Sequence, residues 1–234
     1  LPLAEGAGAP EIRPYTDLLL HDLGPDLADR DAAGCGVPYT TAWDALERSG
    51  VGPGDGLLVI GAAGAVGRAA LDLGRWRGAQ VIGAVRRPQQ VEQLAAEGFE
   101  TILLGEGDDL SAAVRRYYPA GADVVFDTSG AWLGPSVAAL ADFGRIATIA
   151  APPSGRVELP LLDLYRRGGS VVGVNSLLYD SRACAAMLDR FSVAFATGLL
   201  PPPPAPQERL LGNGLEVYRE IAGGSTQKVV FIPG

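Results

Sequence analysis

The sequence predicts an α/β protein built on one parallel, doubly wound sheet of six strands. Short apolar runs recur along residues 57–174, and segments with helical periodicity separate them. Continuously apolar strands are typical of parallel sheets that helices cover on both faces. Right-handed crossovers then give the doubly wound order. We expect strands at residues 57–60, 80–84, 101–104, 123–126, 145–150 and 170–174, and helices at residues 66–76, 89–96, 110–118, 133–141 and 161–167.

The composition excludes several classes of protein. The chain has 234 residues, a formal net charge of −8 and no dense cluster of Lys and Arg, so we expect no nucleic-acid partner. No apolar run reaches membrane-spanning length, and the first residues lack the pattern of a signal peptide. The two cysteines, Cys35 and Cys184, are far apart, which favours a reducing cytoplasm over a disulfide framework.

Shorter segments flank the predicted sheet. Before it we expect a strand at residues 15–21 and a helix at residues 40–48, which the glycine-rich residues 49–56 end. After it we expect a helix at residues 181–197, and four consecutive prolines at 201–204 then predict a stiff, extended connector. The tail is expected to form a helix at residues 215–221 and a strand at residues 228–232.

The turn after the first predicted strand indicates a phosphate-binding loop. Residues 61–67 read Gly-Ala-Ala-Gly-Ala-Val-Gly between a buried strand and a helix. Small residues let the backbone approach a pyrophosphate, to which the start of the helix offers free N–H groups and the positive end of its dipole. A purely structural turn is the alternative. Because the turn heads a Rossmann-like βα series, we expect a dinucleotide to contact Gly61, Ala63, Gly64, Ala65 and Val66.

The end of the second predicted strand distinguishes between the two nicotinamide dinucleotides. An NAD site places an acidic residue there for the ribose hydroxyls, whereas this chain has Arg86 and Arg87, with no acid before Glu92. A guanidinium can bind a 2′-phosphate through two hydrogen bonds. We therefore predict NADP(H), with Arg86 or Arg87 on that phosphate. A solvated arginine pair at a surface turn is the alternative.

Ligands of doubly wound sheets lie at the carboxyl ends of the strands. This rule nominates Thr128, Ser129 and Gly130 after the fourth predicted strand, Ala150, Ala151 and Pro152 after the fifth, and Asn175 and Ser176 after the sixth. Small or hydroxyl-bearing residues would leave room there for the ribose and the nicotinamide. Such residues are also common in ordinary loops, so that reading stays open at each position.

Several stretches together resemble the medium-chain dehydrogenase/reductase superfamily, in its zinc-independent branch of quinone oxidoreductases and enoyl reductases. They are residues 31–46, 51–55, 61–67, 172–176 and 217–224. The resemblance implies a GroES-like catalytic domain, of which this chain is expected to keep only small remnants at both termini. We expect remnants and linker at 1–36, the Rossmann domain at 37–198 and the return segment at 199–234.

The resemblance implies hydride transfer from NADPH to a quinone, an enone or a similar small-molecule acceptor. The alternative is a nucleotide-binding module, such as a biosynthetic cyclase or a regulatory subunit, without redox turnover. Tyr39 and Thr41 lie where the family places residues near the nicotinamide. Thr41 is a candidate cofactor contact, and Tyr39 is a weak candidate for a catalytic hydrogen-bond donor that could equally pack at the start of its helix.

We expect no metal site, because a catalytic zinc needs three protein ligands and Cys35 and His21 are isolated candidates.

The sixth predicted strand should be a sheet edge, and its apolar run at residues 169–174 could pair with a second copy, as the resemblance also implies. The strand at residues 228–232 is expected to pair with residues 15–21 or to leave an open edge.

Overall fold

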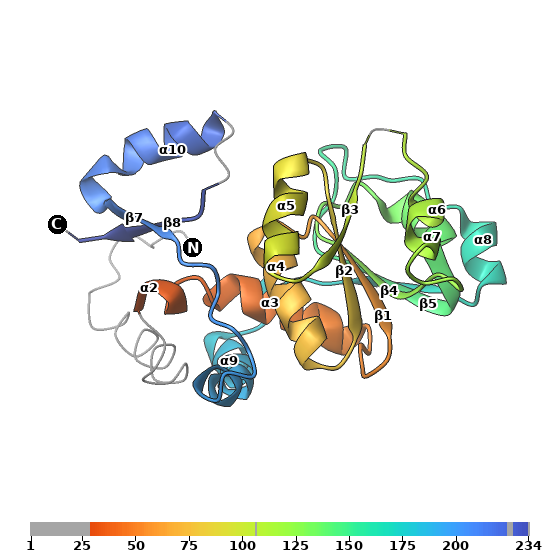
Figure 1. Ribbon diagram of the computed structural model, residues 1–234, viewed down its shortest axis with the longest axis horizontal. Coiled ribbons are helices and arrows are strands. Elements are labelled where there is room, and N and C mark those ends of the chain that lie inside the picture. Colours follow the sequence, from red (N-terminus) through yellow and green to blue (C-terminus); the bar gives the residue numbers. More distant parts are fainter. Residues whose placement is uncertain (1–28, 106, 224–226, 234) are drawn as a thin grey trace. The chain divides into compact units, whose positions relative to one another are not determined.

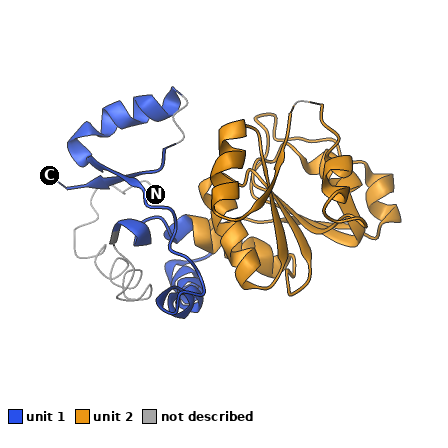
Figure 2. Ribbon diagram, viewed as in Figure 1, with its two compact units in different colours: residues 1–37, 179–234 blue, residues 38–178 orange. Residues whose placement is uncertain are grey.

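The computed structural model describes residues 29–105, 107–223 and 227–233, which belong to two compact units (Figure 2). One unit comprises residues 38–178, and the other comprises residues 1–37 and 179–234. The helix after residue 180, which the sequence analysis assigns to a domain at 37–198, groups here with the C-terminal elements. The predicted strand at residues 15–21 lies outside the described residues.

The unit of residues 38–178 contains the predicted six-stranded parallel sheet. Its order is β3-β2-β1-β4-β5-β6, so the chain reverses direction across the sheet between β1 and β4 (Figure 1). The predicted fold class is confirmed. The strands are β1 (Gly56–Ile60), β2 (Gln80–Val85), β3 (Glu100–Leu103), β4 (Ala122–Asp127), β5 (Leu140–Thr148) and β6 (Ser170–Gly173).

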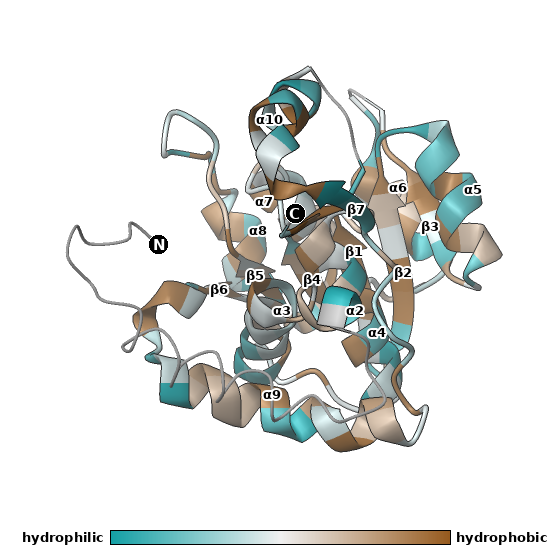
Figure 3. Cartoon of the chain, turned by 90° about the vertical axis from the view of Figure 1, so that its left-hand side faces the viewer, coloured by the Kyte–Doolittle hydropathy of each residue, from teal (hydrophilic) through white to brown (hydrophobic). Residues whose placement is uncertain are grey.

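Helices connect these strands and cover the sheet. The hydropathy pattern follows this layering: β2 is brown in Figure 3, whereas α5 is largely teal. All five residues of β1 are buried, as continuous apolar strands between two helical layers require. The helices are α3 (Gly36–Arg48), α4 (Ala65–Trp76), α5 (Pro88–Ala96), α6 (Leu110–Arg115), α7 (Leu133–Ala139) and α8 (Leu161–Arg166), with the short 3₁₀ turn η2 (Ser176–Leu178) after β6.

The prediction is wrong at the junction of α7 and β5, where a helix was expected to run through Ala141. Leu140 instead begins β5 and pairs with Ala122, and the register shifts before Val124 pairs with Arg145. Phe143 lies in this irregular stretch at a φ of 60°, which is rare for a residue other than glycine. Tertiary pairing here overrides the helical pattern.

The second unit contains α2 (Asp29–Ala32), α9 (Ser181–Ala196) and a C-terminal βαβ unit. In that βαβ unit β7 (Gln207–Leu210) leads through the 3₁₀ turn η3 (Leu211–Asn213) and α10 (Gly214–Ala222) to β8 (Val229–Ile232). β8 pairs in parallel with β7, a strand that the sequence did not predict. The expected pairing of β8 with residues 15–21 falls on residues outside the described part of the chain. The sequence Gln-Glu-Arg-Leu of β7 has no apolar run, which is why the strand was missed.

Both edges of the six-stranded sheet are defined. The edge strands are β3 and β6, the latter as predicted from residues 169–174.

None of the helices in the described part of the chain combines the length and the apolar composition that crossing a membrane requires.

Candidate functional site

The turn after β1 is shaped by close backbone contacts. Gly61 has a φ of +79°, and a Cβ atom there would overlap Oγ1 of Thr128. That hydroxyl donates a hydrogen bond of 2.7 Å to the carbonyl oxygen of Ile60. Only glycine satisfies both the backbone conformation and the space at position 61. The end of β1 is thereby fixed against the end of β4.

Two further glycines bring α4 close to this turn. A Cβ atom at Gly67 would overlap the carbonyl oxygen of Gly61 and lie 2.8 Å from the Cα atom of Ala62. At Gly64, the residue before the helix, it would lie 3.1 Å from the same oxygen. Within the described residues no side chain caps this end of α4. The first N–H groups of the helix, beginning at Ala65, therefore remain available to a ligand.

A cavity of about 450 Å³ lies at the carboxyl ends of the central strands, beside this turn. It occupies the region where β1 and β4 are neighbours and the chain changes direction across the sheet, which is the usual ligand site of doubly wound folds. Its lining residues are Ile60, Gly61, Ala63, Gly64, Ala84, Val85, Arg86, Gln90, Leu104, Ser129, Ala131, Trp132, Ala151, Pro152 and Pro153.

The charge of the cavity wall comes from Arg86. This exposed side chain follows β2 and is the one charged residue among the described lining residues. Arg87 does not line the cavity. It precedes α5, where its backbone N–H donates to Oε1 of Gln90 at 3.3 Å. The structure thus separates two arginines that the sequence left equivalent.

The loop after β4 is organised by the buried carboxylate of Asp127. Its Oδ1 atom accepts hydrogen bonds from the backbone N–H groups of Ser129 and Gly130 at 2.9 and 3.0 Å, and from the Ser129 hydroxyl at 2.7 Å. Its Oδ2 atom accepts from the backbone N–H of Trp132 at 2.9 Å. Four donors thus hold the turn that carries Ser129 and Trp132 to the cavity.

Other predicted contacts at the strand ends do not line this cavity. The Thr128 hydroxyl binds the carbonyl of Ile60, as described above. The carbonyl of Ala150 accepts from the Thr148 hydroxyl at 3.1 Å, and Oδ1 of Asn175 accepts from the Leu177 N–H at 3.1 Å. These three residues make contacts within the protein, whereas Ala151 and Pro152, which were nominated together with Ala150, line the cavity.

The candidates at the start of α3 also lie outside the lining. Tyr39 is 2% exposed, and its hydroxyl donates to Oδ2 of Asp72 at 3.4 Å. The hydroxyl of Thr41 lies 2.8 Å from that of Ser176, which joins α3 to the turn after β6. Tyr39 therefore occupies the packing position that the sequence left as its alternative role.

Asp72 also belongs to an ionic cluster with Arg68 and Glu97. Arg68 lies 2.6 Å from Oδ1 of Asp72 and 2.5 Å from Oε2 of Glu97, and its guanidinium lies over the ring of Phe99. Burial raises the pKa of Asp72, and the charge of Arg68 opposes that rise. The cluster ties α4 to α5 without contributing to the cavity lining.

Sequence reasoning missed the lining residues Gln90, Leu104 and Trp132. Gln90 lies three residues after Arg87, in the first turn of α5, so helical spacing could have nominated it. Trp132 reaches the cavity only through the turn around Asp127. No local pattern predicts that turn.

The described residues do not fit a catalytic metal. Among residues 29–105, 107–223 and 227–233 no group of three His, Cys, Asp or Glu side chains could hold one. Cys35 is fully buried, and burial raises the pKa of its thiol to about 12, which keeps it protonated at neutral pH. His21 lies outside the described residues.

Comparison with known proteins gives consistent matches. The sequence profile of a family described as zinc-binding dehydrogenase matches residues 65–192, more than half of the chain. A zinc-type alcohol dehydrogenase-like protein of Schizosaccharomyces pombe, C337.11, is 30% identical over 177 residues, which cover 74% of this chain and 51% of that protein. YfmJ of Bacillus subtilis, whose name describes an NADP-dependent oxidoreductase, is 30% identical over 142 residues, which cover 59% of this chain and 42% of YfmJ.

Among solved structures, a quinone oxidoreductase from Thermus thermophilus, whose description includes a complex with NADPH, superposes with a TM-score of 0.72 and 27% identity. The match covers 86% of this chain and 64% of that one. This chain spans about half the length of C337.11 and somewhat less than half of YfmJ.

Proposed function

The chain belongs to the zinc-binding dehydrogenase family of the medium-chain dehydrogenase/reductase superfamily, and on this premise we propose that its cavity binds NADP(H) within an oxidoreductase. The observation that carries the proposal is the combination of an uncapped helix start with a single guanidinium in a cavity wall without carboxylates. A pyrophosphate suits the first element, and a 2′-phosphate suits the second.

Each part of the site has a defined role in this proposal. The N–H groups at the start of α4 bind the pyrophosphate, which Gly61 and Gly64 allow to approach the backbone. Arg86 binds the 2′-phosphate, and Ser129 and Trp132 also line the cavity. When bound, NADPH supplies the hydride. The residues of this chain bind and orient the dinucleotide and exclude water from it.

For the acceptor we propose a quinone, an enone or a similar carbonyl compound. The solved quinone oxidoreductase supports this class through its similarity over most of the chain. We also propose zinc-independent chemistry, because no group of three potential metal ligands occurs among the described residues. The second candidate is binding of the dinucleotide without redox turnover.

Titration with the two dinucleotides tests the cofactor. The purified chain is titrated with NADPH and with NADH while the nicotinamide fluorescence is followed. We expect tighter binding of NADPH, and Arg86→Ala should weaken it about 10- to 100-fold through the loss of a charge-assisted contact of about 1.5–3 kcal/mol. NADH binding should change little.

Arg87→Ala and Arg166→Ala are the control variants, because each removes one arginine as Arg86→Ala does. Arg166 is exposed on α8, and neither residue lines the cavity. An Arg87→Ala effect as large as that of Arg86→Ala would contradict the assignment of the phosphate to Arg86. Binding of neither dinucleotide would contradict the proposal as a whole. Tight NADPH binding without consumption by quinones or enones would favour the module without turnover.

We further propose that two copies join through β6. Besides the half-exposed Val171 on this edge strand, an apolar surface lies on the neighbouring α8 and on η2. Leu161, Leu162, Leu177 and Leu178 are each more than half exposed on these elements. Pairing of the β6 edges would satisfy their backbone groups and cover apolar side chains.

Light scattering tests the dimer. Val174 donates to Thr148 on β5, so the alternate residue Val171 directs its N–H to the open edge. Val171→Pro removes that outward donor and should shift the chain from dimer to monomer at micromolar concentration. A wild-type chain that is monomeric at that concentration would contradict the proposal.

A further inference from the structure

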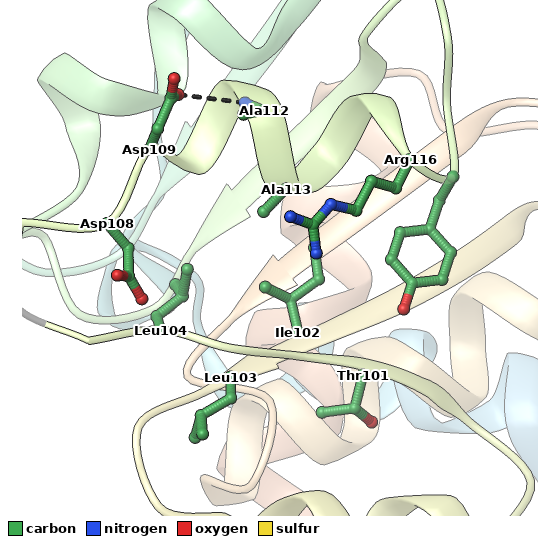
Figure 4. A pocket seen from close by; sticks show the side chains of 10 residues that line it. Thr101, Ile102, Leu103, Leu104, Asp108, Asp109, Ala112, Ala113 and Arg116 are labelled. Atoms are coloured by element: carbon green, nitrogen blue, oxygen red, sulfur yellow. Dashed lines mark hydrogen bonds between the residues drawn. The ribbon is translucent and has the colours of Figure 1, made fainter.

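A second cavity, of about 410 Å³, lies between β3 and α6 (Figure 4). Thr101, Leu103 and Leu104 line one wall, and Ala112, Arg116 and Tyr117 line the other. Leu104 also lines the proposed dinucleotide cavity, so the two cavities share one side chain. The proposed cofactor role uses no other residue of this second cavity.

One wall of this cavity is the open edge of the sheet. The Leu104 N–H donates to the Val85 carbonyl at 2.7 Å, toward β2. Because alternate residues of a parallel strand face opposite neighbours, the backbone groups of Thr101 and Leu103 face away from β2. No backbone partner for these outward groups occurs among the described residues.

On the opposite wall, Arg116 carries a positive charge. In Figure 4 the guanidinium of Arg116 extends from the helix side over Ile102 of β3. Arg116 makes no ion pair within the described chain. The two carboxylates of the lining accept hydrogen bonds locally: Asp108 from the Gly105 N–H at 2.5 Å, and Asp109 from the Ala112 N–H at 3.0 Å.

We propose that this groove binds an extended, carboxylate-bearing peptide segment of a partner protein, which adds to β3 as a seventh strand. The unpaired backbone groups of Thr101 and Leu103 supply the ladder, and Arg116 selects a carboxylate on the added strand. Leu103, which is 47% exposed, offers apolar surface beside that ladder.

Two features favour a strand over a compact ligand. First, the recognition groups follow one another along a strand of four residues, which spans about 13 Å. Second, β3 contains no proline, so Thr101 and Leu103 keep the backbone N–H groups that an added strand would pair with. The net charge of the whole chain is −8, so nonspecific attraction of acidic peptides is not expected, and selection of a carboxylate must come from Arg116.

Fluorescence anisotropy tests the proposal with two dye-labelled heptapeptides. In the first, valine alternates with glutamate; in the second, lysine replaces glutamate. We expect the wild-type chain to bind the glutamate peptide at least tenfold more tightly than the lysine peptide. Arg116→Glu should weaken binding of the glutamate peptide at least tenfold, and so should Leu103→Pro, which removes one outward N–H without touching the ladder to β2.

Two matched variants serve as controls. Val171→Pro makes the same change at the opposite edge of the sheet, and Arg166→Glu makes the same charge change on α8; both should keep peptide binding. NADPH titration and circular dichroism check that each variant remains folded. Equal binding of the two peptides, or binding of neither at about 1 mM, would overturn the proposal. Full competition by N-acetylglutamate amide would also overturn it, in favour of a small-carboxylate site.

Discussion

Two of the chain's βαβ units have similar length but very different burial. In the first, β1 and β2 are joined through α4; in the second, β7 and β8 are joined through α10. All five residues of β1 are buried, and α4 buries seven of its residues. In the second unit three residues of β7 are exposed, all four of β8 are half-buried, and α10 buries only Val217.

The difference shows that a βαβ connection alone does not make a core. β1 lies between β2 and β4, so both of its edges are paired and helices cover both of its faces. Within the described residues β7 and β8 pair only with each other. A comparable substitution should therefore lower the free energy of unfolding much more in the first unit than in the second. Two substitutions of the same kind, one in each unit, can measure this difference.

The largest expected difference concerns the ion pairs. Arg68 and Asp72 are almost buried on α4, whereas Arg209 and Glu220, 3.4 Å apart, are more than one third exposed on average. Arg68→Met should lower the free energy of unfolding by about 3–5 kcal/mol at neutral pH, because it leaves a buried carboxylate without its partner. Glu220→Gln should cost less than about 1 kcal/mol. Urea unfolding measures both values.

This deficit should depend on pH. An acid whose pKa is raised by folding stabilises the native state below its unfolded pKa, and that contribution is lost as the pH rises through the raised value. Burial raises the pKa of Asp72, and loss of Arg68 would raise it further. The deficit of Arg68→Met should therefore be small near about pH 4 and grow toward neutral pH. A deficit independent of pH would contradict a buried charge as its cause.

A smaller difference is expected between two helix-starting glycines, Gly67 of α4 and Gly214 of α10. A Cβ atom at Gly67 would overlap the Gly61 carbonyl, whereas at Gly214 the nearest atoms, of Phe231, are 3.9 Å away. Gly67→Ala should cost about 2–3 kcal/mol and weaken NADPH binding, because α4 must move away from the turn. Gly214→Ala should be neutral or stabilising by up to about 1 kcal/mol. Equal costs would refute the steric comparison.

The smallest difference concerns two tyrosines. The Tyr118 hydroxyl donates to the Gln80 carbonyl at 2.7 Å below β1 and β2, and burial raises the pKa of this phenol. Tyr218 of α10 is 66% exposed, 6.1 Å from the ring of Phe231. Tyr118→Phe should cost about 1 kcal/mol in thermal or urea unfolding. Tyr218→Phe should have no measurable effect, and a comparable loss there would argue for a hidden partner.

Sequence reasoning succeeded where local pattern and tertiary structure agree. The strands of the six-stranded sheet are recognisable because burial on both faces requires continuous apolar runs, as in β1. It failed for β7, whose polar residues are tolerated because three of its four positions are exposed. It also failed at Leu140, where pairing with Ala122 ends α7 two residues earlier than its pattern predicts.

The candidate site shows the same division. Gly61 and Gly64 were predictable because the turn after the first strand places them by sequence position alone, whereas the sequence did not distinguish Arg86 from Arg87. Thr128, Ala150 and Asn175 were nominated from the ends of their strands, yet the Thr128 hydroxyl binds the Ile60 carbonyl on β1, and Ala150 and Asn175 accept hydrogen bonds within their own loops. Which member of a loop reaches the cavity depends on contacts distant in sequence, and residue type does not encode them.

The carboxylate of Asp127 has a thermodynamic consequence. Its four hydrogen bonds fix the turn from Ser129 to Trp132 before any ligand arrives. A preformed wall has little conformational entropy left to lose on association, so the contacts it makes are retained more fully in the affinity. Calorimetry should therefore show no large unfavourable entropy of binding from ordering of this loop. A substitution that loosens the turn should make the entropy of binding more unfavourable.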